Sequence, residues 1–196
     1  KTSTIASVST LISRLFVDRA HLYNAAGVAV RCGLGPILAL TKWGGGQIDA
    51  AGAYTDDTTD LQDAGVNDFP VSTLVNDTGF IVGATEKWSI AKFVVGTARV
   101  VGGGGDTYEY TYWNGAAWTD LTASLIDTPS WASVATTYMT FFVPDDWVLG
   151  GTGTGVPATR YNIRVRATAA PGTTAAIITS AQIARIEDLR KIATVV

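Results

Sequence analysis

Few residues of this chain could carry out chemistry. His21 is the only histidine and Cys32 the only cysteine among 196 residues. A histidine-based zinc site needs more ligands than this, and a Ser-His-Asp triad built around His21 would lack a Gly-x-Ser-x-Gly elbow. The run VGGGGDT lacks the Lys and the Ser or Thr with which a P-loop holds phosphate and magnesium. We therefore predict that the chain is not an enzyme and has no cofactor.

Two groups of aspartates are the next candidates. Four of them crowd the segment TDDTTDLQD at 55–63 and offer oxygen ligands to calcium, but they miss the spacing of an EF-hand loop, so a solvated acidic turn is the competing interpretation. Asp145 and Asp146 could be the paired carboxylates of a glycosidase. Adjacent residues on a strand point to opposite faces, however, so a turn after Pro144 explains this pair more simply.

The stretch YEYTYWNGAAWTDLT at 108–122 places aromatic residues on both sides of an Asn-Gly pair, which is a strong hairpin signal. A two-residue loop would set Glu109 opposite Asp120, and like charges that face each other destabilise a ladder. We therefore predict a four-residue loop that pairs Trp113 with Trp118. The tyrosines would then face the core, and the two tryptophans would share the more polar face.

The tryptophan pair is the candidate binding site of the sequence. An aromatic pair stabilises a fold by about 0.5–1.5 kcal/mol beyond its burial. A structural role is therefore one interpretation of Trp113 and Trp118. The other two are a contact with a protein partner and stacking on a sugar ring, which would make the chain a carbohydrate-binding jelly-roll module.

The elements that must position these residues are strands. From Gln47 to about Thr168, short β-branched and aromatic runs alternate with turn signals, which is typical of an antiparallel sandwich or jelly roll. In YNIRVRAT, at 161–168, apolar and polar residues alternate, so one side is core and the other solvent or partner. The glycine run at 150–155 predicts a mobile loop tip. The expected strands cover 79–82, 87–95, 107–113, 118–124, 137–143 and 160–168.

We therefore predict an all-β fold, an antiparallel β-sandwich or jelly roll with an N-terminal arm and a C-terminal tail. The arm and a leading strand would occupy 1–46, the sandwich 47–172 and the tail 173–196. In the tail, isoleucine and leucine recur every three residues after Ser180, and both a helix and a strand fit this pattern. The arm and the tail supply further candidate interaction residues: Ile5, Val8, Ile12, Leu15, Ile183 and Ile186.

Composition narrows the choice of partners. Lys and Arg number 14 against 17 Asp and Glu, for a net charge of -3, and there is no basic cluster, so we predict no nucleic-acid partner. No run of eighteen apolar residues occurs, so we predict no membrane partner. Only 16% of residues are charged, against about 25% in an average domain. A surface partly covered by neighbours, or a thermostable or secreted β-protein, would suit this composition.

Four segments in order resemble a β-rich module of structural proteins of tailed bacteriophages. They are NDTGFIVGATEKWSIAKFVV at 76–95, YEYTYWNGAAWTDL at 108–121, FFVPDDW at 141–147 and RYNIRVRAT at 160–168. The glycine-rich insertion at 150–155 and the N-terminal section depart from the common pattern of the module.

The resemblance implies a non-enzymatic virion component, either a capsid decoration (cement) protein or a piece of tail fibre or baseplate. The chain is short and lacks the long repeats or heptads of a fibre shaft, which favours a cement protein. Its partners would then be the major capsid protein and copies of itself. It would form a homo-oligomer on the outer capsid surface of the virion.

Overall fold

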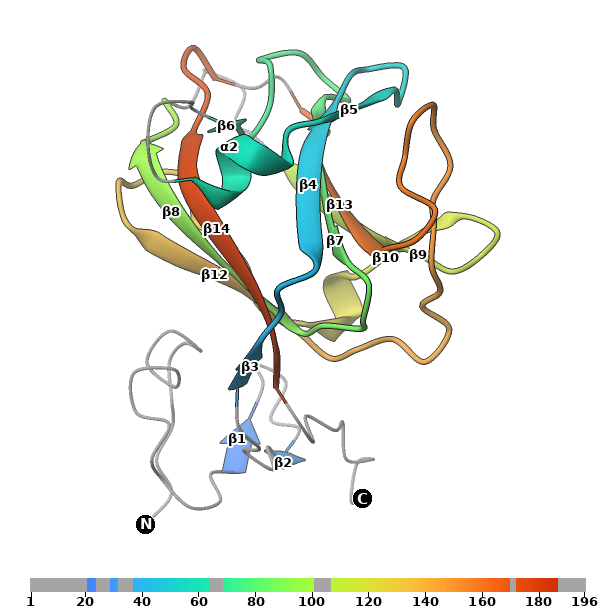
Figure 1. Cartoon of the computed structure of the whole chain (residues 1–196). Helices are drawn as coiled ribbons and strands as arrows, with labels where there is room; N and C mark the ends of the chain where they lie inside the picture. Colours follow the sequence, from blue (N-terminus) through green and yellow to red (C-terminus); the bar gives the residue numbers. More distant parts are fainter. Residues whose placement is uncertain are drawn as a thin grey trace.

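The structure is a computed structural model that describes residues 21–23, 29–31, 37–63, 69–100, 107–169 and 172–186. Two antiparallel sheets pack face to face, and a separate two-stranded ladder joins β1 (His21–Tyr23) to β2 (Ala29–Arg31) (Figure 1). The first sheet contains, in spatial order, β10 (Trp118–Asp120), β9 (Tyr108–Trp113), β13 (Tyr161–Ala167), β7 (Gly79–Ala84), β4 (Trp43–Ile48) and β5 (Tyr54–Asp56). The second contains β11 (Leu125–Asp127), β12 (Thr136–Phe141), β8 (Ile90–Thr97), β14 (Ile177–Ile186) and β3 (Ile37–Ala39), and β6 (Phe69–Pro70) also pairs with β14.

The all-β antiparallel sandwich predicted from the sequence is confirmed, and each of the six expected strands is found. The expected strand 118–124 ends at Asp120 and continues as a 3-10 turn, η1 (Thr122–Ser124). Within the described residues, the α-helix is the short α2 (Thr58–Gln62), whose Leu61 is completely buried. The described part of the chain contains no helix with the length and hydrophobicity needed to span a membrane.

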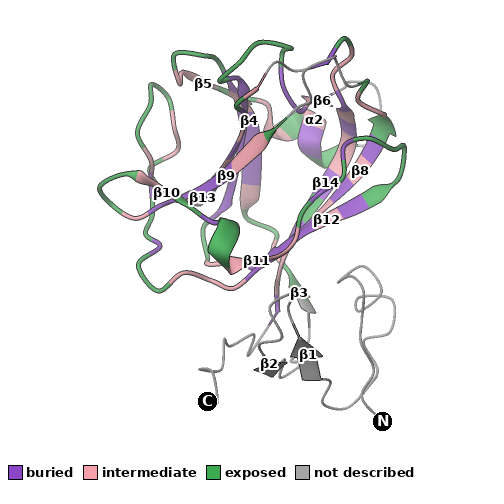
Figure 2. Cartoon of the chain, turned by 180° about the vertical axis from the view of Figure 1, so that it is seen from behind, coloured by how far each residue is buried: buried purple, intermediate pink, exposed green. Residues whose placement is uncertain are grey.

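The core lies between the two sheets, and the residues coloured as buried gather on the strands of both sheets (Figure 2). Strands β7 and β13 each send alternate apolar side chains inward, as the period of two requires. Large aromatic residues fill the space in edge-to-face contacts, such as Trp88 with Phe141 and with Trp147 at ring-centre distances of 5.0 and 5.7 Å. Burial of each such side chain contributes on the order of 1.5–3 kcal/mol to folding.

Strand β4 crosses the boundary expected at 46/47, between the N-terminal arm with its leading strand and the sandwich. Strand β4 carries the triplet Gly44–Gly46 and pairs with β7 along its whole length. A β-carbon on Gly45 would lie 2.8 Å from the carbonyl oxygen of Ile81, and one on Gly46 would lie 2.7 Å from the ring of Tyr54. Glycine is used here because neighbouring atoms approach the strand closely, although glycine normally indicates a turn.

The segment expected to be a C-terminal tail, 173–196, contains strand β14. Strand β14 lies between β8 and β3 inside the second sheet, so the segment predicted as a tail is a central strand up to Ile186. The strand interpretation of this segment is therefore correct for the described residues. Irregular pairing at Ile177, Ile178 and Ser180 shifts the register, which explains why apolar residues there do not alternate strictly.

The end of β14 and the short β3 leave the sandwich side by side (Figure 1). Their ladder pairs Ala184 with Ala39 and Ile186 with Ile37. We call this pair the ribbon, defined by residues 37–39 and 184–186. The chain therefore enters and leaves the sandwich at the same pole. The predicted arm residues Ile5, Val8, Ile12 and Leu15 lie outside the described residues.

Candidate functional site: the tryptophan pair and its strap

The hairpin has the predicted register. Trp113 pairs with Trp118, and Leu121 N–H donates to the carbonyl oxygen of Tyr110 at 2.8 Å. Across the loop, Asn114 N–H donates to the carbonyl oxygen of Ala117 at 3.2 Å. The prediction of a four-residue loop from the charges of the two strands is confirmed.

The tyrosine face of the hairpin is part of the core, as predicted. Tyr110 and Tyr112 are each 7% exposed, and Leu121 is completely buried. The hydroxyl of Tyr112 donates to Asp146 Oδ1 at 2.8 Å, which fixes the turn after Pro144 against β9. Burial and this neighbouring carboxylate raise the pKa of Tyr112 to about 12.

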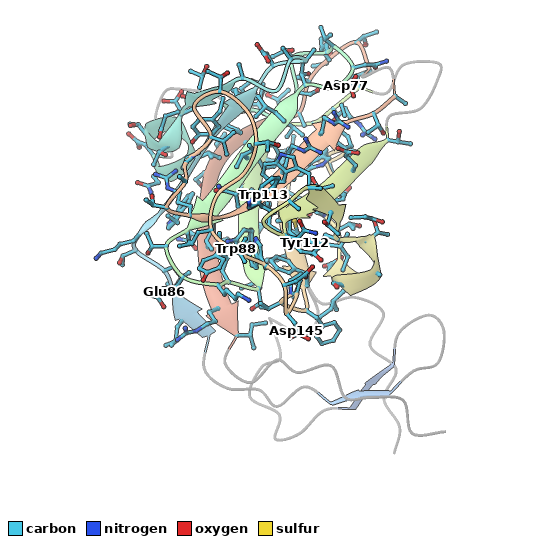
Figure 3. The ribbon with its side chains drawn as sticks, turned by 90° about the vertical axis from the view of Figure 1, so that its right-hand side faces the viewer. Asp77, Glu86, Trp88, Tyr112, Trp113 and Asp145 are labelled. Atoms are coloured by element: carbon cyan, nitrogen blue, oxygen red, sulfur yellow. The ribbon has the colours of Figure 1, made fainter. Side chains whose placement is uncertain are left out.

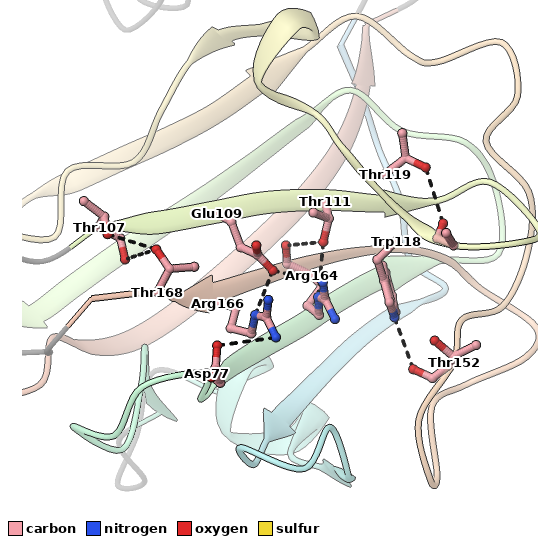
Figure 4. A network of polar contacts seen from close by, with 11 residues as sticks. Asp77, Thr107, Glu109, Thr111, Trp118, Thr119, Thr152, Arg164, Arg166 and Thr168 are labelled. Atoms are coloured by element: carbon pink, nitrogen blue, oxygen red, sulfur yellow. Dashed lines mark hydrogen bonds and ion pairs between the residues drawn. The ribbon is translucent and has the colours of Figure 1, made fainter.

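Trp113 and Trp118 pack on each other at the end of the hairpin (Trp113 is labelled in Figure 3), with ring centres 5.8 Å apart and planes at 63°. Trp113 is only 8% exposed. The Arg164 guanidinium lies 4.9 Å from the ring centre of Trp118, and the indole N–H of Trp118 donates to the carbonyl oxygen of Thr152 at 3.2 Å (Figure 4). A sugar ring needs an open, flat aromatic face, which Trp113 does not offer.

The segment that covers this pair spans residues 150–157, and we call it the strap. The carbonyl oxygen of Thr154 accepts a hydrogen bond from Tyr54 N–H at 2.8 Å, which ties the strap to β5. A β-carbon on Gly151 would lie 2.7 Å from the ring of Trp118, so glycine lets the strap approach the indole. The glycine run is thus held at Gly151 and Thr154, while residues 152–155 are exposed.

Asn162 holds both ends of the strap. Its side-chain amide is completely buried and donates to the carbonyl oxygens of Gly150 and Pro157 at 3.0 and 2.8 Å. The predicted alternation along β13 is confirmed for Ile163 and Val165, which are core residues. Asn162 does lie on the opposite face, but the strap removes it from solvent.

Beside the tryptophan pair, four charged side chains form a network on the outer face of the first sheet (Figure 4). Glu109 Oε1 accepts a hydrogen bond from Arg164 at 2.9 Å and forms an ion pair with Arg166 at 2.7 Å, and Arg166 also forms an ion pair with Asp77 at 3.5 Å. Burial and the neighbouring Arg166 lower the pKa of Arg164, and Glu109 opposes this. The network contains two cations and two anions, so it carries no net charge of its own.

The acidic segment 55–63 includes the end of β5 and the whole of α2. Asp56 Oδ1 accepts a hydrogen bond from Thr58 N–H at 3.0 Å. Burial, and then the charges of Asp60 and Asp56, raise the pKa of Asp57. Within the described ranges, no group of three or more His, Cys, Asp or Glu residues is arranged to hold a metal ion.

The turn predicted at Asp145 and Asp146 is confirmed. Trp147 N–H donates to the carbonyl oxygen of Pro144 at 3.4 Å, and Trp147 is 1% exposed. Lys87 Nζ donates to the carbonyl oxygens of Pro144 and Asp145, both at 3.3 Å. These residues anchor the turn to the sandwich.

The other candidate interaction residues of the tail face inward. Ile183 and Ile186 are 1% and 5% exposed, so they are core residues of β14 and offer no surface to a partner. A groove of about 550 Å³ does run beside β14, lined by side chains that include Trp43, Gln62 and Lys92. Sequence reasoning missed this groove, because its lining comes from segments that only the fold brings together.

No protein-family model, no curated protein and no solved structure matches this chain.

Proposed function

We propose that this protein is a non-enzymatic structural component of a tailed-bacteriophage virion. Within the virion, we propose a capsid decoration (cement) protein that bridges major capsid subunits on the outer surface of the shell. The assignment to a virion rests on the resemblance of four segments to a phage module. The observation that carries the bridging role is the ribbon.

The four resembling segments form one continuous unit, which supports reading them together. Strand β13, from the last segment, lies between β7 and β9, from the first two. The third segment supplies Trp147, whose ring centre lies 5.5 Å from that of Tyr161 in β13. Residues that match in sequence therefore also pack against each other, which is compatible with a single module.

The ribbon suits a protein that reaches its neighbours with terminal segments. Residues 1–36 and 187–196 both join the sandwich there, because Ile37 pairs with Ile186. Segments that start from one pole can engage one partner or two adjacent partners while the sandwich stays intact. Repeated on many copies, contacts that are individually weak add up to firm attachment. Copies of the chain itself are partners in this proposal.

The test is to image the intact assembly that contains this chain and to measure its copy number. We expect close to one copy per coat-protein subunit, and we expect particles that lack the chain to burst on mild heating. A few copies per particle would place the chain in a tail fibre or baseplate. Absence from purified virions would contradict the proposal.

A carbohydrate-binding jelly-roll module is the alternative from another class. It requires Trp113 or Trp118 to meet a sugar ring, although Trp113 is 8% exposed. Under the structural interpretation, Trp113→Ala destabilises the hairpin and changes no glycan binding. Glycan retention by the wild type that is lost in a folded Trp113→Ala variant would favour the alternative.

A further inference from the structure

The hairpin loop of residues 114–117 carries the groups needed for a covalent modification. We propose that Asn114 is a deamidation site in the folded protein, where the main-chain nitrogen of Gly115 attacks the side-chain amide. The products are aspartate and isoaspartate at position 114. This inference is independent of the proposed virion role.

The electrophile is the side-chain amide carbon of Asn114. Its oxygen, Oδ1, accepts hydrogen bonds from the N–H groups of Ala116 and Ala117 at 2.9 and 2.8 Å. Attack on the amide carbon moves negative charge onto this oxygen. Two N–H groups already aimed at it stabilise that charge, as the donors of an oxyanion hole do. The same bonds hold the amide over the loop that contains Gly115.

The nucleophile is the backbone nitrogen of Gly115. This residue is exposed and has no side chain to obstruct the approach to the amide carbon. Its φ of 97° is a conformation that glycine adopts readily. Among the described residues its N–H donates no hydrogen bond, so water or hydroxide can remove the proton.

The reaction balances with water as its only co-reactant. A base takes the proton of Gly115 N, the nitrogen bonds to the amide carbon of Asn114, and the amide nitrogen leaves as ammonia after gaining a proton. Water then opens either carbonyl of the resulting succinimide ring. The net change is the loss of ammonia and the gain of one water molecule.

The rest of the chain provides an internal comparison. Asn162 is completely buried, and its amide is held by two carbonyl oxygens, with the β-branched Ile163 following it. Asn76 is exposed but is followed by Asp77, whose side chain obstructs the approach of the nitrogen. Asn114 should therefore be modified well before either of these residues.

The two products should differ in their effect on the hairpin. Aspartate keeps a side-chain oxygen that can accept from Ala116 and Ala117, so the loop is preserved with one more negative charge. Isoaspartate routes the main chain through the former side chain. That lengthens a loop which sets Trp113 opposite Trp118.

The test follows the full chain by peptide mapping and mass spectrometry during incubation at mildly alkaline pH, folded and in urea. We expect the peptide that contains Asn114 to gain about one dalton and to split into aspartate and isoaspartate forms. We expect a folded-state rate of at least about one tenth of the rate in urea. The variant Asn114→Asp, which should fold normally, serves as the mass and retention standard.

Two results would overturn the inference. One is a folded chain that keeps Asn114 intact while the chain in urea loses it more than about ten times faster, which would show that the loop protects the amide. The other is faster modification of Asn76 or Asn162 than of Asn114 in the folded chain.

Discussion

Asn162 shows how one side chain can fix a whole segment. Its two amide hydrogens bind the carbonyl oxygens of Gly150 and Pro157 at the two ends of the strap. A buried carbonyl without a donor costs about 1–3 kcal/mol. The strap therefore depends on this residue more than on its own glycines.

We expect Asn162→Ala to lower the free energy of unfolding by about 2–4 kcal/mol, because two carbonyl groups lose their donors and a cavity forms. Asn162→Asp keeps the size but turns both donors into acceptors, so it should cost at least as much. Urea unfolding measures both effects. The exposed Gln182→Ala is the control and should stay within about 0.5 kcal/mol of wild type. An unchanged midpoint for Asn162→Ala would show that the strap is held elsewhere.

Buried tyrosines predict a loss of stability in alkali. Burial is the main cause that raises the pKa values of Tyr54, Tyr110 and Tyr112 to about 12, from an ordinary value of 10.0. Between these values the unfolded chain releases protons that the folded chain retains, so stability is complete below pH 10 and falls as pH rises toward 12. Urea midpoints across this window, with absorbance of tyrosinate, measure the loss.

Tyr112→Phe separates the contribution of one tyrosine from the others. It removes one proton that the folded chain retains, so the fall in urea midpoint across the alkaline window should be shallower than in wild type. It should also lower stability at neutral pH, because the hydrogen bond to Asp146 is lost. An equally steep fall in the variant would show that Tyr112 does not contribute to the alkaline loss.

At the scale of elements, the sequence predicts those strands whose own side chains show the β pattern of alternating apolar and polar residues or of opposed charges. The hairpin register followed from Glu109 and Asp120, because charge repulsion across a ladder is a local effect. Strand β4 could not be predicted in this way, since Gly44–Gly46 are explained by atoms of β5, β7, α2 and Arg160 that lie beside them. Likewise, the sequence does not show that the strap is anchored. Asn162 alternates with core residues of β13 and is therefore expected to face solvent, whereas it binds both ends of the strap.

Removal of strand β14 tests where the sandwich ends along the chain. It pairs with β8, β6 and β3, so its removal would split the second sheet and expose the core beneath Ile178 and Ile183. A chain that ends after Ala176 should therefore fail to fold. A chain that ends after Ile186 should unfold at nearly the wild-type temperature. Circular dichroism and thermal unfolding check both, and a folded chain without β14 would show that it is an accessory tail.

At the scale of the whole molecule, the two sheets form one sandwich, and the ribbon connects this sandwich to residues 1–36. Strand β3 adds only three residues to the edge of the second sheet, and Leu38 within it is 39% exposed. The sandwich core contains nothing from residues before Leu40 among its described members. Folding and attachment should therefore be separable.

We expect a chain that starts at Ile37 to keep the sandwich, with a melting temperature close to that of the full chain, but to lose incorporation into particles. The reason is that the ribbon ladder from Ile37 to Ala39 is retained, whereas every residue beyond it at the N-terminal side is removed. The measurement is rebinding of purified chain to particles that lack it, with copy number read by gel densitometry. A matched control that lacks 187–196 instead shows which terminal segment carries attachment. Full occupancy by both truncated chains would place the contact surface on the sandwich itself and contradict the bridging role of the ribbon.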